Sequence, residues 1–138
     1  MAQERLNLSE ERLLELEENF WVSKRGDFMR LGLGVRHNLT PGYPVLNFHD
    51  FGGKYYLAAD EPAPHQDGYT QSRELTNAEI VTFVQVARRV APEAEMTSKL
   101  VEEATKLLWS RADELKKQMD PLYEALRIVS PPDSESQY

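Results

Sequence analysis

Hydrophobic residues change their spacing twice along this chain of 138 residues. Over residues 9–22 they recur at intervals of three and four, over 29–35 they alternate with polar residues, and from residue 76 the longer interval returns. An interval near 3.6 predicts helices, and alternation predicts half-buried strands. We therefore expect an α+β domain with an N-terminal helix, a small three-stranded antiparallel sheet, and two to three C-terminal helices packed on one sheet face.

The first apolar stripe runs through Leu13, Leu16 and Phe20, with Trp21 beside it. Asn7 and Ser9 are both good N-cap residues, and glutamates follow in the first turn, where the helix dipole favours negative charge. The pattern predicts a helix that begins near residue 7 or 9 and ends at the polar residues 24–26. We interpret Trp21 as a core residue of this helix.

The segment 29–36 predicts a strand whose polar face carries Arg30 and Arg36. After it, Gly52 and Gly53 stand between two apolar and aromatic runs, which predicts a hairpin with a two-residue primed turn. This turn sets the register of the two strands and separates an amphiphilic face from a core face. The pairs expected on the amphiphilic face are Phe51 with Lys54, His49 with Tyr56, and Asn47 with Ala58. The residues expected on the core face are Leu46, Phe48, Leu57 and Ala59.

Residues 60–75 are poor in apolar positions and contain Pro62 and Pro64, so we expect a long surface connection. Thr76 and Glu79 have the spacing of a capping box that opens a helix. A longer helical pattern follows to about residue 119, and Pro121 predicts a kink or a fresh short helix there. We expect one domain over residues 1–129, with residues 130–138 as a disordered tail.

Apolar residues at heptad-like spacing continue through the C-terminal part of the chain, over residues 108–129. This stripe has two interpretations, because it could cover the protein's own sheet or pair with a second copy in a homodimer. The presence of apolar positions on two sides of the helix favours covering the sheet. Trp109, in the same stretch, is interpreted as a core residue like Trp21.

The formal net charge is -7, but the charge is unevenly distributed. Residues 21–58 carry five basic and two acidic residues, whereas both flanking segments are acidic. Direct binding to nucleic acid is therefore disfavoured, and a larger protein with a basic surface is the expected partner. The segment after Met1 has no apolar core of a signal peptide, and no run of 18 apolar residues occurs, so we expect a cytoplasmic protein with no membrane contact.

No sequence motif predicts an enzyme. The chain has no cysteine, which excludes thiol nucleophiles and cysteine metal sites within it. His37, His49 and His65 lack the spacing of a known metal motif, and no nucleophile elbow or phosphate-binding glycine loop is present. Paired glutamates fall on predicted helices as solvated faces. We therefore expect a protein without catalytic residues, metal or cofactor.

Two functions from different classes fit this sequence. The first is a small acidic, non-enzymatic regulator or inhibitor that binds a larger, nucleic-acid-handling host machine, in the manner of phage inhibitors or immunity proteins. The second is a binding protein for a nucleotide or a phosphorylated metabolite, held by arginine forks and aromatic stacking. The regulator would use the acidic helical surface, the amphiphilic sheet face or both, whereas the ligand-binding protein would use the sheet face. The candidate binding residues of the sheet are Arg30, Arg36, Asn47, His49, Lys54 and Tyr56. A ligand site requires a concave pocket, whereas a protein contact can be flat.

Overall fold

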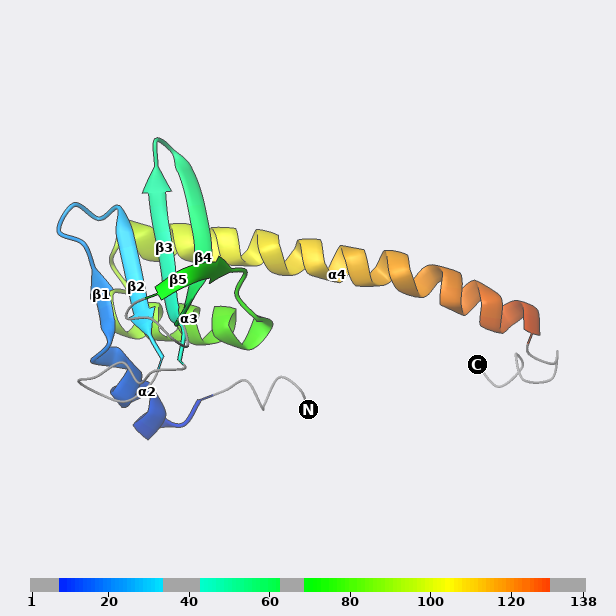
Figure 1. Cartoon of the computed structure of the whole chain (residues 1–138), viewed down its shortest axis with the longest axis horizontal. Coiled ribbons are helices and arrows are strands. Elements are labelled where there is room, and N and C mark those ends of the chain that lie inside the picture. The colour runs from blue at the N-terminus through cyan, green and yellow to red at the C-terminus, as the bar shows by residue number, and fades with distance from the viewer. Residues whose placement is uncertain (1–7, 34–42, 63–68, 130–138) are drawn as a thin grey trace. The chain divides into compact units, whose positions relative to one another are not determined.

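The structure is a computed structural model that describes residues 8–33, 43–62 and 69–129. These residues form three helices and five strands in the order α2, β1, β2, β3, β4, β5, α3, α4 (Figure 1). The chain divides into two compact units, residues 1–104 and 105–138, with the boundary inside α4. The first unit holds the whole sheet, so the prediction of an α+β architecture with an antiparallel sheet is confirmed.

The sheet has five strands, not the three that were predicted. They pair in chain order, β1 to β5, and every neighbouring pair is antiparallel. The bounds are β1 Phe20–Val22, β2 Phe28–Gly32, β3 Val45–Phe51, β4 Lys54–Pro62 and β5 Tyr69–Arg73. The two strands that the sequence pattern did not reveal are the outer ones, β1 and β5.

The first helix is shorter than predicted. Helix α2 spans Glu10–Glu17, and the Ser9 hydroxyl accepts the backbone N–H of Arg12 at 3.2 Å, as expected for the cap. Phe20 and Trp21 belong to β1, where they pair with Leu31 and Arg30 of β2. The prediction that the helix continues through them is wrong. Pairing with β2 satisfies their backbone hydrogen bonds, and this outweighs the weak helical preference of one further turn.

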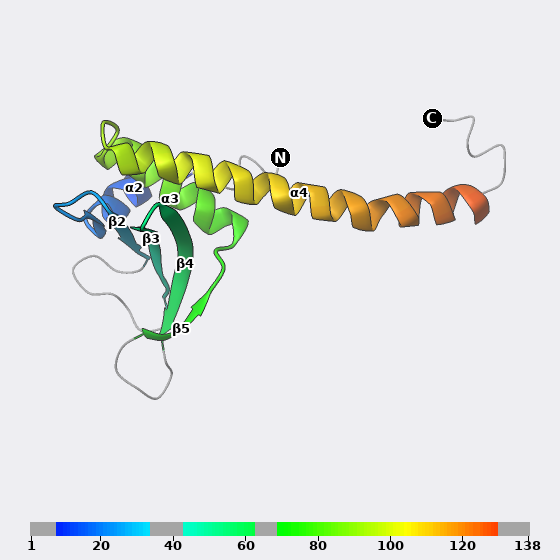
Figure 2. The same cartoon turned by 90° about the horizontal axis from the view of Figure 1, so that it is seen from above.

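The second strand is also shorter than predicted, since β2 ends at Gly32 within the described residues. Residues 34–42, including the predicted strand end and Arg36, lie outside the described residues, as does the expected tail 130–138. Residues 69–73, predicted as part of a surface connection, instead form β5 against β4. Strand β5 is the edge strand of the sheet beside β4, and the chain continues from it into α3 (Figures 1 and 2).

The central hairpin has the predicted register. Phe51 pairs with Lys54, His49 with Tyr56, and Asn47 with Ala58. Gly52 and Gly53 have φ of 59° and 87°, both in the left-handed region that a type I′ turn requires. The Gly53 N–H also donates to the Asp50 carboxylate at 2.8 Å, which closes the turn.

The core lies between one face of the sheet and the helices (Figure 2). From the sheet come the fully buried side chains Met29, Leu31, Leu46, Phe48 and Ala59. From the helices come Leu16 of α2, Ile80 and Phe83 of α3, and Met96, Leu100 and Ala104 of α4. The predicted core face of the hairpin is thus confirmed for Leu46, Phe48 and Ala59, while Leu57 is half-buried.

Two further contacts fix helices within the first unit. Arg89 of α3 forms ion pairs with Glu17 and Glu10 of α2, at 2.6 and 2.9 Å. The Lys99 ammonium of α4 lies 5.9 Å from the centre of the Tyr55 ring on β4. These contacts are exposed or half-exposed, so the apolar core remains the main source of stability.

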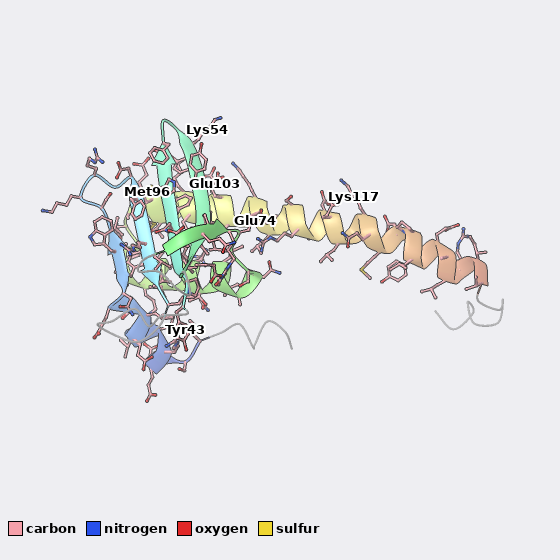
Figure 3. All side chains as sticks on the ribbon, viewed as in Figure 1. Tyr43, Lys54, Glu74, Met96, Glu103 and Lys117 are labelled. Atoms are coloured by element: carbon pink, nitrogen blue, oxygen red, sulfur yellow. The ribbon has the colours of Figure 1, made fainter. Side chains whose placement is uncertain are left out.

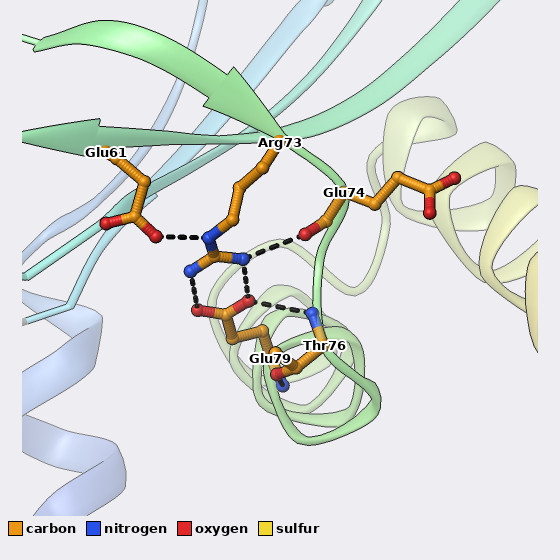
Figure 4. A network of polar contacts seen from close by, with 5 residues as sticks. All are labelled: Glu61, Arg73, Glu74, Thr76 and Glu79. Carbon is orange, nitrogen blue, oxygen red and sulfur yellow. Dashed lines mark hydrogen bonds and ion pairs between the residues drawn. The ribbon is translucent and has the colours of Figure 1, made fainter.

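Arg73, the last residue of β5, connects the sheet edge to α3 (Figure 4). Its guanidinium pairs with Glu61 of β4 and donates two hydrogen bonds, of 2.7 and 2.8 Å, to the Glu79 carboxylate. Glu79 also accepts the Thr76 N–H at 2.8 Å, so the predicted capping box is confirmed. Burial alone would raise the pKa of Glu79, but the Arg73 and Thr76 hydrogen bonds hold it below its ordinary value.

The C-terminal helical region is simpler than predicted. Helix α3 spans Asn77–Val90, and α4 spans Glu95–Val129 without interruption at Pro121, so the expected fresh helix is not formed. Proline removes one N–H donor, and its neighbours here are mostly good helix formers. Within the described residues, no helix combines the length and the apolarity needed to cross a membrane.

In the second unit most apolar side chains of α4 are exposed, while Leu107 and Leu108 are half-buried. Trp109 is 70% exposed, so it is not a core residue, and the same correction applies to Trp21 at 53%. The stripe that was expected to be buried against the sheet is likewise accessible to solvent. Its exposed members are Leu115, Met119, Leu122, Leu126 and Val129.

Candidate functional site

The side of the sheet opposite the helices carries most of the predicted site residues. The strand register aligns Trp21 with Arg30, Arg30 with Asn47, and Phe28 with His49. Side chains that are directly opposite on neighbouring strands share a face, so β1 to β4 all contribute to this surface. We call it the open sheet face and define it by Trp21, Phe28, Arg30, Asn47, His49, Phe51, Lys54 and Tyr56.

Aromatic rings form a continuous row across the open sheet face. The His49 ring stacks between Phe28 and Tyr56, with ring centres 5.8 and 5.4 Å away. Phe51 and His49 form a T-shaped pair with ring centres 4.9 Å apart. At the other end of the row, the ring centres of Trp21 and Phe28 are 5.7 Å apart. His49 is half-buried by these rings, and its Nδ1 has no hydrogen-bond partner. The row leaves large rings accessible at both ends and in the middle, because Trp21, Phe51 and Tyr56 are all exposed.

Positive charge accompanies these rings. Arg30 is exposed beside Trp21, and Lys54 is exposed at the tip of the β3–β4 hairpin (Figure 3). Arg25, in the turn before β2, lies 3.4 Å from the Asp27 carboxylate. The Ser23 hydroxyl donates to Asp27 at 2.7 Å and, together with Arg25, lowers the pKa of that carboxyl. Arg30 and Lys54 are thus two exposed cations on a chain whose net charge is -7, and the Asp60 carboxylate lies near Arg30.

Asn47 has a different role from its neighbours. It is 7% exposed, and its side-chain amide donates to the Asp60 carboxylate across the hairpin at 2.6 Å. This bond satisfies two polar groups on the floor of the face, which would otherwise be costly to bury. The structure thus brings together Arg30, Asn47, His49, Lys54 and Tyr56, with Asn47 as a structural member. Arg36 lies outside the described residues.

The relief of the face is shallow. One hollow, of about 440 Å³, opens beside the hairpin and is lined by Trp21, Phe28, Arg30 and His49 among others. A second, of about 320 Å³, lies over the middle strands between Arg30, Asn47, Asp60 and Ser72 of β5. Both are open to solvent, so the face offers a broad surface with open depressions in place of an enclosed pocket.

Trp21 and Phe28 are the members of this face that sequence reasoning missed. Trp21 was assigned to a helix, which removed it from any sheet face. Phe28 precedes the alternating segment, although it shares the phase of Arg30, two residues later. A signal was present in the run Phe20, Trp21 and Val22, since three consecutive aromatic or β-branched residues favour a strand.

The described residues offer no arrangement for metal binding, because no three histidine, aspartate or glutamate side chains among them converge on a point. His37 and His65 lie outside that part of the chain. Comparisons of this chain with models of protein families, with curated proteins and with solved structures give no match. The open sheet face is therefore the feature of the described residues that best indicates a function.

Proposed function

We propose that this protein is a small acidic, non-enzymatic regulator or inhibitor that docks on a larger protein through the open sheet face. The observation that supports this best is the exposure of Trp21, Phe51 and Tyr56, at 53%, 68% and 46%, on a single broad surface. Aromatic residues and arginine dominate the energetics of protein contacts, whereas exposed apolar patches are rare on surfaces without partners. The shallow relief suits a protein partner better than an enclosed small molecule.

Charge defines the class of partner. The net charge of -7 draws the chain toward a protein with a basic surface, and enzymes that handle nucleic acid carry such surfaces. Exposed glutamates of α2, such as Glu11, contribute to this long-range attraction. At short range, Arg30 and Lys54 supply cations for the partner's carboxylates or carbonyl groups around an aromatic centre. In this proposal, overall charge sets the rate of encounter, and the open sheet face sets its specificity.

The test is affinity capture from the lysate of the native host with three tagged baits, namely the natural chain, a face variant and a control variant. The face variant combines Arg30→Ala, Lys54→Ala and Tyr56→Ser. We expect the natural chain to retain one stoichiometric protein that is released as salt rises. The face variant should lose at least about ten-fold of it, because truncation of a central anchor costs about 2 kcal/mol or more.

The control variant removes two positive charges and one tyrosine elsewhere, through Arg88→Ala, Lys117→Ala and Tyr43→Ser. All three of these residues are exposed, and none belongs to the open sheet face. It should capture the partner as well as the natural chain does. Equal capture by a folded face variant would exclude the open sheet face as the contact. Equal loss in both variants would show that capture does not depend on the open sheet face.

A small-ligand function is the second candidate, and the hollow over the middle strands is the observation that favours it. There the exposed Arg30 guanidinium lies near the ring row of Phe28 and His49, which is suited to a phosphate next to a base. If this function holds, nucleotides or phosphorylated metabolites should be released when the purified protein is denatured. Titration with that ligand should then show that the single substitution Arg30→Ala is enough to abolish binding.

A further inference from the structure

The part of α4 that lies in the second unit of the chain carries an apolar seam with the spacing of a coiled coil. Successive steps of four and three residues connect seven apolar side chains, and no polar residue interrupts them. Such a period of 3.5 keeps one stripe facing a partner helix over several turns. In heptad notation, the d positions are Leu108, Leu115, Leu122 and Val129, and the a positions are Ala112, Met119 and Leu126. We call these seven residues the α4 seam.

Most of the α4 seam is exposed. Leu115, Leu122 and Leu126 are each at least 57% exposed, and Trp109 and Tyr123 beside them are at least 60% exposed. Pro121 lies at a c position, away from the seam. The exposed apolar side chains thus follow one another along the helix for several turns, as an interface between helices requires.

Charge identifies a second copy of this chain as a suitable occupant. Residues 105–129 contain five basic and four acidic residues, although the whole chain has a net charge of -7. Two copies of this segment can therefore approach without the repulsion that the rest of the chain would produce. The segment is also too poor in net charge to select a strongly acidic or basic foreign helix by complementarity.

The residues that flank the seam favour antiparallel helices. In a parallel pair, Arg111 at g would face Lys116 at e of the other copy, twice per dimer. The a positions also lack the β-branched residues that favour parallel dimers. In an antiparallel pair centred near residue 117, Ala112 faces Leu122, Leu115 faces Met119, and Leu108 faces Leu126 of the second copy.

This antiparallel arrangement improves the flanks as well. Trp109 then lies beside Tyr123 of the second copy, and Arg111 lies opposite Ala125 instead of a lysine. Lys116 meets its own copy once at the centre, so one like-charge contact replaces two. We infer that the α4 seam forms an antiparallel homodimer, which would present two open sheet faces in one particle. This inference is independent of the proposed function.

The first experiment is sedimentation velocity on the full chain over a range of concentrations. We expect a monomer–dimer equilibrium. Leu122→Lys should weaken it at least about hundred-fold, because it places unpaired charges in the seam. Ile128→Lys is the matched control, since Ile128 is a 72% exposed residue of the same helix that lies outside the seam. It should change the dissociation constant less than about three-fold. A natural chain that stays monomeric, or equal loss in both variants, would overturn the inference.

The second experiment fixes the direction of the helices and uses the absence of cysteine from the chain. In the antiparallel dimer, Gln118 lies beside Gln118 of the second copy, so Gln118→Cys should crosslink on oxidation. Leu126 faces Leu108 of the second copy, and the two copies of Leu126 lie about 27 Å apart at 1.5 Å per residue. Leu126→Cys should therefore remain uncrosslinked. Efficient crosslinking at residue 126 with none at 118 would show parallel helices and overturn the antiparallel arrangement.

Discussion

The two faces of the sheet are both rich in aromatic and aliphatic side chains, yet only one of them is covered. On the helix side, Phe48 is fully buried, whereas Phe51, three residues further along the same strand, is 68% exposed on the other side. Alternation along a strand explains why the two point in opposite directions. It does not explain why the exposed side keeps its rings, and that retention is what suggests a binding surface.

The largest expected effect comes from a charge on the covered face. Phe48→Asp should lower the free energy of unfolding by about 4 kcal/mol or more, because it combines a cavity with a buried carboxylate. The matched variant Phe51→Asp should lower it by less than about 1 kcal/mol. Urea denaturation followed by circular dichroism measures both. Similar stabilities for the two variants would mean that the strand faces are assigned to the wrong sides.

A smaller loss of stability is expected at the ion pair that connects the edge strand β5 to α3. Glu79→Gln removes the carboxylate that pairs with Arg73 and caps α3, which should cost about 1–2 kcal/mol at pH 7. Because the pKa of Glu79 is lowered in the folded protein, this contribution is present above its ordinary pKa of about 4.3. It is lost as the pH falls through the lowered value.

The difference in stability between the natural chain and Glu79→Gln should therefore narrow below about pH 4.3. Glu124→Gln is the control, since Glu124 also has a lowered pKa beside Arg127 but lies on an exposed part of α4. It should leave the midpoint of the urea transition unchanged at every pH. If the difference in stability between the natural chain and Glu79→Gln stayed constant down to pH 3, the ion pair with Arg73 would contribute nothing to stability.

Local signals account for what the sequence predicted well. The glycine pair fixed the hairpin register, and Thr76 with Glu79 marked the start of α3, because both depend on residues within one turn. Strand β5 was missed because it depends on pairing with β4, which its weakly apolar sequence does not indicate. Strand β1 was missed because the helical spacing of the preceding residues was extended over its short aromatic and β-branched run. Helix α4 was divided at Pro121 for the opposite reason, since a strong local signal was overridden by helix formers on both sides.

The candidate site shows the same division. Register placed His49 opposite Tyr56 and predicted the amphiphilic face, and alternation placed Arg30 on the polar face of its strand. Five exposed or half-exposed members of the open sheet face could therefore be named in advance, namely Arg30, His49, Phe51, Lys54 and Tyr56. The burial of Asn47 could not be predicted, because its hydrogen bond to Asp60 depends on the pairing of β3 with the far half of β4. Trp21 was not predicted as a member of the open sheet face, because its segment was assigned to a helix and not to strand β1.

A further test concerns the turn that decides which side chains face which side. Gly53 has φ of 87°, where a side chain is strained, so Gly53→Ala should cost about 1 kcal/mol. Gly52→Asn should be nearly neutral, since asparagine tolerates the left-handed region near the 59° observed there. Neither glycine has neighbours that a Cβ would meet, so conformational strain is the sole cause. An unaffected Gly53→Ala in thermal unfolding would contradict the type I′ turn.

The smallest effect on the free energy of unfolding is expected at Trp21, where the covered and the open side of the sheet differ between two neighbouring residues. Trp21 and Phe20 are neighbours in β1, but Phe20 points to the covered side opposite Leu31, and Trp21 points to the open side opposite Arg30. Trp21→Ser should change the free energy of unfolding by less than about 0.5 kcal/mol, whereas Phe20→Ser should cost about 2 kcal/mol. A ring that adds little to stability yet keeps its place on an exposed strand is better explained by binding than by folding. If Trp21→Ser proved as destabilising as Phe20→Ser, the ring row would be a structural element, and the argument for a docking face would lose its main support.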